Sequence, residues 1–284
     1  MKIPASIATL TCVAVLASGT ASAQELFAGS PDTTVQLGGS LAEDQDVAVD
    51  NQLGIVLLED LGPLPAAAEV TAYALDANGD RLFGLETTTS LLGGVVVTPR
   101  DVVRWDGAAY SIELDGTTEG IPRGAAIDAI ATSPGDAVLV SFDTTVAVDG
   151  QTFADEDLAR FDGALFVSAF DGSAAGMAAR FDVDAAQDLG GGTFLVSLDT
   201  SGHLGGVDFD DEDVLRYDGA AWSLEIDASA LDADWRRADL DAMQVPEPGL
   251  VGTLLAGALA FFTFARRRRR MPTRPGSALP ERRA

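Results

Sequence analysis

The chain has 284 residues, of which 47% are hydrophobic, so its composition is that of a folded protein and not of a disordered one. Residues 24–245 hold 42 of the 44 acidic residues and 9 of the 18 basic ones, a net charge near −33 that argues against nucleic acid as a partner. The only cysteine, Cys12, and the only lysine, Lys2, lie near the start, so the rest of the chain has no thiol for a disulfide, a metal or a nucleophile.

Residues 1–23 have the pattern of a removable secretory signal peptide. Lys2 precedes an apolar stretch, and Ala21 and Ala23 occupy the small-residue positions that signal peptidase recognises. We therefore expect cleavage before Gln24.

A seven-residue pattern recurs through the next part of the chain. It is DVVRWDG at 101–107, DLARFDG at 157–163 and DVLRYDG at 213–219, a spacing of 56 residues both times. A fainter copy begins at Asp46. Four units of about 56 residues then fill residues 24–245, which we interpret as one domain.

Each unit is predicted to hold four short strands. The first strands are expected at 70–75, 127–132, 181–185 and 240–245, and the second strands at 26–28, 82–85, 138–142 and 194–198. The third strand lies in the recurring pattern, and the fourth strands are expected at 110–114, 165–170 and 222–226. The Asp-Gly pair after each third strand indicates a hairpin with a type I′ turn, which has positive φ at both central residues.

The second strands, such as VLVSF at 138–142, are apolar at successive positions, so both faces of each sheet must be covered. Small four-stranded antiparallel sheets that repeat and are buried on both faces are typical of β-propellers. Tandem β-sandwiches would need about 100 residues per unit. The sequence therefore predicts an all-β, four-bladed β-propeller. Because the domain starts at a second strand and ends after a first strand, the C-terminal strand is expected to complete the first blade and close the ring.

The long connections, from second to third strands and from each unit to the next, are predicted to share one face, here called the long-loop face. Acidic residues recur there, and carboxylates in flexible loops suit calcium. An alternative is that these side chains only hydrogen-bond to their own turns. The candidate calcium ligands are Asp143, Asp155, Asp157, Asp199, Asp211 and Asp213.

One arginine recurs in the third strand of three units, two residues before an aspartate on the same strand face. Bidentate ion pairs between strands or blades are the predicted role. The residues are Arg104 with Asp106, Arg160 with Asp162, and Arg216 with Asp218.

Catalytic residues are not predicted. His203 is the only histidine, and we expect it at the surface because no cysteine or serine elbow accompanies it. Paired carboxylates could hydrolyse a glycoside, but among 42 acidic residues such a pair is expected by chance.

The C-terminal part has three successive features. Pro246, Glu247 and Pro248 precede an uncharged, mainly apolar run at 249–265. At a helical rise of ~1.5 Å, this run spans about 26 Å, enough to cross a bilayer core as one transmembrane helix of the precursor. The arginines that follow are expected to stay cytoplasmic, which leaves the domain on the other side. They are Arg266, Arg267, Arg268, Arg269 and Arg270.

Composition alone would favour a plain membrane anchor, but the order of these features at 246–270 resembles the PEP-CTERM sorting signal of Gram-negative bacteria that export extracellular polysaccharide. The resemblance implies that an exosortase, a membrane-embedded cysteine protease, recognises and removes the signal. Such signals usually end soon after the arginines, whereas a Pro- and Arg-rich tail, interpreted as disordered and cytoplasmic, continues here over 271–284.

The sequence therefore predicts an exported protein that is anchored in the inner membrane as a precursor and lies at the cell surface or in the extracellular matrix when mature. Its expected role is structural or adhesive and linked to exopolysaccharide or biofilm, with signal peptidase and exosortase as partners during export. No cofactor other than calcium is expected. The alternative is a propeller that binds or degrades polysaccharide.

Overall fold

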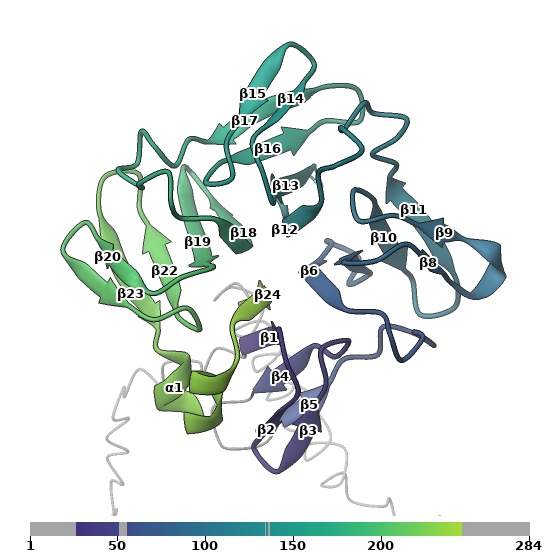
Figure 1. The fold of residues 1–284 in the computed structure, drawn as a ribbon, viewed down its shortest axis with the longest axis horizontal. Helices are drawn as coiled ribbons and strands as arrows, with labels where there is room; N and C mark the ends of the chain where they lie inside the picture. The colour runs from purple at the N-terminus through teal and green to yellow at the C-terminus, as the bar shows by residue number, and fades with distance from the viewer. Residues whose placement is uncertain (1–26, 51–55, 134, 136, 246–284) are drawn as a thin grey trace, which may run out of the picture.

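The structure is a computed structural model that describes residues 27–50, 56–133, 135 and 137–245. Four antiparallel four-stranded sheets stand around a common centre as the blades of a propeller (Figure 1). One strand of each blade lies next to the axis, namely β24, β6, β12 and β18. The predicted all-β, four-bladed propeller is therefore confirmed.

The strands of each blade are given from the centre outward. Blade 1 consists of β24 (Leu240–Gln244), β1 (Phe27–Pro31), β4 (Ala48–Asp50) and β5 (Val56–Leu58). Blade 2 consists of β6 (Val70–Leu75), β7 (Arg81–Leu85), β10 (Val102–Trp105) and β11 (Tyr110–Leu114). Blade 3 consists of β12 (Ile127–Thr132), β13 (Val138–Phe142), β16 (Leu158–Phe161) and β17 (Phe166–Phe170). Blade 4 consists of β18 (Val183–Gly190), β19 (Thr193–Leu198), β22 (Val214–Tyr217) and β23 (Trp222–Ile226).

Most predicted strand bounds agree with the structure within two residues, but β1, β18 and β5 differ. β1 ends at Pro31 and not at Ala28, and β18 ends at Gly190 and not at Ala185. β18 begins at Val183 and not at Phe181, because the N–H of Phe181 donates to the carbonyl of Ala178 in a turn. β5 was not predicted, since the repeat is faint in the first unit.

The connections from second to third strands, predicted as long loops, each contain a further two-stranded hairpin. Their inward side chains, such as Leu37 and Phe153, are buried, so these hairpins extend the core toward the long-loop face. They are β2 (Val35–Leu37) with β3 (Ser40–Ala42), β8 (Thr89–Ser90) with β9 (Val96–Val97), β14 (Val146–Val148) with β15 (Gln151–Phe153), and β20 (Gly202–Leu204) with β21 (Val207–Phe209). The short helices are η1 (Leu92–Gly94), α1 (Ala228–Leu231) and η2 (Ala233–Arg237).

The hairpin after each third strand is confirmed, but the predicted type I′ turn is wrong. Gly163 has a φ of 91°, whereas Asp149 is the sole non-glycine residue with positive φ in the described part of the chain. The aspartate of each turn is held outside the left-handed region because its carboxylate accepts backbone N–H groups. Asp162, for example, accepts from Ala164 at 3.0 Å and from Leu165 at 2.9 Å.

The hydrophobic core is divided into four clusters, one between each pair of neighbouring blades. All five residues of β13 are buried, as a strand covered on both faces requires.

The ring closes in blade 1, where β1 pairs antiparallel with β24. Gly29 is opposite Met243, and a Cβ at Gly29 would lie 2.5 Å from Cδ1 of Leu240, so a larger residue there would displace this buried side chain. The predicted closure by the C-terminal strand is therefore confirmed.

Candidate metal centre

The second residue of each inner strand lies where the pairing with the next strand shifts register. The first residues, such as Ile127 and Val183, are fully buried between blades. The residues that follow them are only partly buried, and a bulge re-aims the side chain at its position. They are Thr71, Asp128, Asp184 and Asp241.

Acidic residues also precede three of the four inner strands. Together with the three aspartates of the inner strands they form what we call the axial acidic cluster, at the long-loop end of the axis. Its members are Glu69, Asp128, Asp182, Asp184, Asp239 and Asp241.

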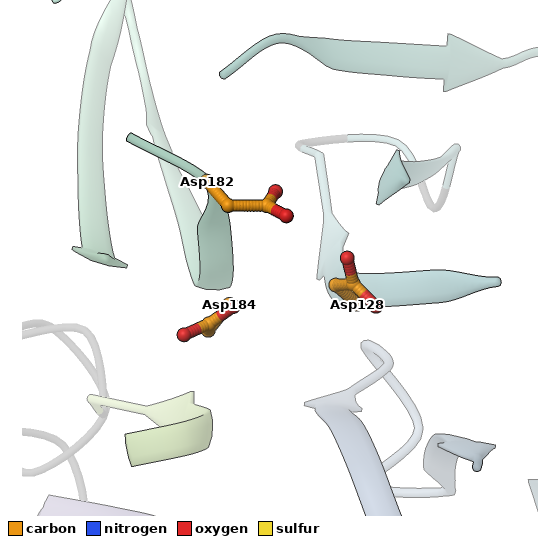
Figure 2. Close-up of side chains that lie close together, drawn as sticks. All are labelled: Asp128, Asp182 and Asp184. Atoms are coloured by element: carbon orange, nitrogen blue, oxygen red, sulfur yellow. The ribbon is translucent and has the colours of Figure 1, made fainter. Parts of the chain in front are cut away.

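Three members of this cluster come close enough to share one ion. One carboxylate oxygen each from Asp128, Asp182 and Asp184 lies within 4.8 Å of the other two. Figure 2 shows the side chains of Asp182, just before β18, and Asp128, on β12, turned toward each other. Asp182 and Asp184 lie on either side of Val183, the first residue of β18 in blade 4, whereas Asp128 comes from blade 3.

Burial and mutual repulsion raise the pKa of these carboxyl groups. Burial, followed by the charges of Asp239 and Asp241, raises the pKa of Asp184 to about 10. Burial and the charge of Asp182 raise the pKa of Asp128 to about 8, and similar causes raise the pKa of Asp182 to about 7. None of the three forms a salt bridge with an arginine in the described ranges.

One oxygen of the cluster lacks a hydrogen-bond partner. Oδ1 of Asp182 is buried and receives no hydrogen bond from the residues that the structure describes. A buried carboxylate oxygen without a partner is costly, and a proton or a cation would satisfy it. Carboxylate oxygens are the ligands that calcium and magnesium prefer.

The six predicted calcium ligands lie around this cluster but do not form it. Asp143 accepts the N–H of Ala126 at 2.8 Å, and Asp199 accepts the N–H of Asp182 at 3.1 Å. Such bonds tie the end of each second strand to the residue before the inner strand, 17 residues away, and not to a turn of the aspartate's own.

The aspartates that open the third strands have a similar role. Asp157 accepts the N–H of Ala154 at 2.9 Å and that of Gly172 at 3.0 Å. Asp213 accepts equivalent bonds from Asp210 and Ala228. The two remaining candidates contribute charge: Asp155 raises the pKa of Asp182, and Asp211 that of Asp239.

The axial acidic cluster was not predicted from the sequence, because the calcium ligands were expected in the loops and not on the inner strands. A signal was nevertheless present. Asp128, Asp184 and Asp241 recur at spacings of 56 and 57 residues inside otherwise apolar strands, where a charged residue is unexpected.

Two of the three recurring arginines form ion pairs, but not with the predicted aspartates. Arg104 pairs with Glu113 and Asp80 at 2.9 Å each and also contacts Asp76. Arg216 lies 3.7 Å from Glu225.

The strand register explains which arginines find partners. Arg104 is opposite Ser111 and Arg216 opposite Ser223, and in both hairpins a glutamate follows two residues later on the same face. Arg160 has Ala169 at that position, and it forms no salt bridge within the described ranges. The predicted aspartate partners are wrong, because these residues accept backbone N–H groups of their own turns. They are Asp106, Asp162 and Asp218.

His203 lies at the surface, as predicted. It belongs to the β20–β21 hairpin, and its Nδ1 is 2.7 Å from Oδ1 of Asp208, which is also exposed. The signal-peptidase and sorting-signal predictions, at 1–24 and 246–270, lie outside the described residues. Within the described ranges, no helix is long and apolar enough to cross a membrane.

Comparison with known proteins gives no family. No family model and no characterised protein matches the sequence. Among solved structures, the chain is similar to YCF48 from Cyanidioschyzon merolae, with a TM-score of 0.30 and 9% identity over 65% of this chain and 52% of that one.

Two further structures show the same degree of similarity. Virginiamycin B lyase from Staphylococcus aureus has a TM-score of 0.31 and 9% identity over 72% of this chain and 87% of its own. A protein of unknown function from Bacteroides caccae has a TM-score of 0.30 and 11% identity over 72% of both chains. The chain spans about half the length of YCF48, and no activity is transferred at these values.

Proposed function

We propose that this chain is an exported protein of the cell surface or extracellular matrix. In this proposal the propeller has a non-catalytic, structural or adhesive role linked to exopolysaccharide and binds calcium on its axis. The observation that carries the calcium site is the convergence of Asp128, Asp182 and Asp184 within 4.8 Å. The unpartnered Oδ1 of Asp182 supports it, because it leaves an oxygen free to coordinate.

The proposed location outside the cell is consistent with the proposed calcium site. Extracellular protein modules bind calcium with dissociation constants of roughly 10⁻⁴–10⁻³ M, a range suited to the medium outside a cell. Three carboxylates from two neighbouring inner strands would hold blades 3 and 4 together when an ion neutralises their repulsion. A stiff ring of this kind is suited to a scaffold.

The export part rests on the sequence of the two chain ends. Residues 1–23 have the pattern of a signal peptide, and 246–270 resemble the sorting signal that exosortase removes. Deleting the exosortase gene should make the full-length form accumulate in the inner membrane. Unchanged delivery to the surface in such cells would contradict the sorting proposal.

Calcium titration of the full-length protein in a non-ionic detergent, after chelator treatment, tests the axial site. We expect saturable heat and a rise in melting temperature with added calcium. Asp128→Asn should abolish both. Asp208→Asn, which removes an exposed carboxylate on the β20–β21 hairpin, is the matched control and should leave both unchanged. Equal calcium responses in the two variants would rule out the axial site.

A further inference from the structure

The junction between blades 2 and 3 departs from the other three junctions on the long-loop face. It contains a hollow of about 470 Å³. Its polar lining comes from the loops of both blades and consists of Glu86, Thr88, Thr98, Arg100, Arg123 and Asp143.

Corresponding residues in the junctions can be identified from one repeated hydrogen bond. The first residue of an inner strand donates its N–H to a carbonyl two residues before the aspartate that opens the third strand. The pairs are Val70 to Asp44 at 3.1 Å, Ile127 to Pro99 at 2.8 Å, and Val183 to Asp155 at 3.2 Å.

This correspondence shows that the hollow lies where the repeat has lost its acids. Pro99 stands where the other units have Asp44, Asp155 and Asp211. Ala126, also in the hollow, stands where the others have Glu69, Asp182 and Asp239.

An arginine is gained at the same junction. Arg100 takes the place of Glu156 and Glu212, two buried carboxyl residues that are 2% exposed. At these repeat positions the negative charge of the other junctions is therefore lost, and the lining of the hollow holds as many arginines as carboxylates.

The two arginines of the hollow have more N–H donors than hydrogen-bond partners among the described residues. Nη1 of Arg100 donates to the carbonyl of Ile121 at 3.0 Å, which fixes this half-buried side chain. Arg123 is exposed. Within the described ranges neither forms a salt bridge, whereas Arg104, on the same blade, is paired with three carboxylates.

We propose that this hollow binds a sugar carboxylate, that is, a uronate residue. Guanidinium groups bind carboxylates through paired N–H donors. The hydroxyls of Thr88 and Thr98 and the carboxylates of Glu86 and Asp143 offer the donors and acceptors that sugar hydroxyls need. A volume of about 470 Å³ lies in the range of small-molecule sites. A simple inorganic anion would bind to the arginines but would form no favourable contact with the carboxylates of Glu86 and Asp143.

Calorimetric titration of the full-length protein with glucuronate and glucose tests the site. A chelator in the buffer removes divalent cations, so metal binding at the axial acidic cluster does not contribute to the measured heat. Because a hydrogen bond to a charged group is worth more than a neutral one, glucuronate should bind at least about tenfold more tightly than glucose. Arg123→Gln and Arg100→Gln should each weaken glucuronate binding by about tenfold or more.

Arg160→Gln is the matched control, since it removes an exposed arginine of blade 3 that does not line the hollow, and it should bind as the wild type does. Because Arg123 is exposed, we expect Arg123→Gln to fold, and its affinity for glucuronate tests the proposal even if Arg100→Gln fails to fold. Glucuronate binding that is no tighter than glucose binding, or is unchanged in Arg123→Gln, would overturn the proposal. Sulfate that binds as tightly as glucuronate and competes with it would also overturn the proposal. An oligouronate that binds more tightly than the monosaccharide would identify a polymer as the source.

Discussion

Gln187 on β18 and Val245 after β24 hydrogen-bond to each other in both directions. The N–H of Val245 donates to Oε1 of Gln187 at 2.7 Å, and Nε2 of Gln187 donates to the carbonyl of Val245. Both residues are buried. The closing strand is therefore tied to blade 4 as well as to β1.

Replacing Gln187 by Ala should destabilise the domain by about 1–3 kcal/mol, because it leaves the buried N–H of Val245 without its partner. The carbonyl of Val245 would keep only the longer bond from Nε2 of Gln244, at 3.3 Å. Chemical denaturation of the full-length protein measures the change. Gln36→Ala, at an exposed position on β2, is the control and should change stability by less than about 0.5 kcal/mol.

Deleting residues 237–245 should unfold the whole domain and not only blade 1. Leu240, Ala242 and Met243 are almost fully buried, and burial of a large apolar side chain is worth about 1.5–3 kcal/mol. The loss is comparable to a whole domain's margin of about 5–15 kcal/mol. A truncated protein that keeps its cooperative transition and its melting temperature would contradict closure by β24.

Without calcium, the protein should lose stability as the pH rises from about 4 to about 8. The folded-state pKa of Asp128 is raised to about 8 from 3.8, first by burial and then by the charge of Asp182. Between these values the folded state holds more protons than the unfolded state, so stability falls with rising pH. Thermal melts in a chelator across this range measure the effect, and saturating calcium should flatten it. A chelated protein that becomes more stable toward pH 8 would refute this electrostatic account.

Asp128→Asn should have opposite effects with and without calcium. In a chelator at about pH 9, the variant should be more stable than the wild type by at least about 1 kcal/mol, because the amide cannot ionise. In saturating calcium the wild type should be the more stable protein. A variant that is less stable under both conditions would indicate that Asp128 serves packing alone.

Arg104→Met should cost about 1–3 kcal/mol, because the side chain of Asp76 is only 3% exposed and would lose its cationic partner. Burial alone would raise the pKa of Asp76, but the Arg104 guanidinium and the N–H groups of Asp80 and Asn78 lower it below its usual value. Arg160→Met, at the same repeat position without a salt bridge among the described residues, should cost little. Equal losses in the two variants would show that the charge network is not the cause.

The fold could be predicted from sequence because the repeat fixes the number of blades and the apolar second strands require covered faces. The hairpins within the long connections were missed because strands such as Thr89–Ser90 are too short for alternation to show. The axial cluster depends on four inner strands meeting at one axis, a relationship that no single unit reveals. The ion-pair partners depended on register: Glu113 lies diagonally across the hairpin from Arg104, whereas Asp106 lies in the turn.

The pairing of β1 with β24 also implies an order of events during the proposed export. If the chain is translocated from its N-terminus, Phe27 emerges first, yet its blade stays one strand short until Leu240–Gln244 has followed. A chain whose synthesis stops early would reach the far side with an open edge on β1 and remain exposed to proteases. Completion of the ring therefore requires that translation has reached the last strand, and we expect only chains that include β24 to become protease-resistant.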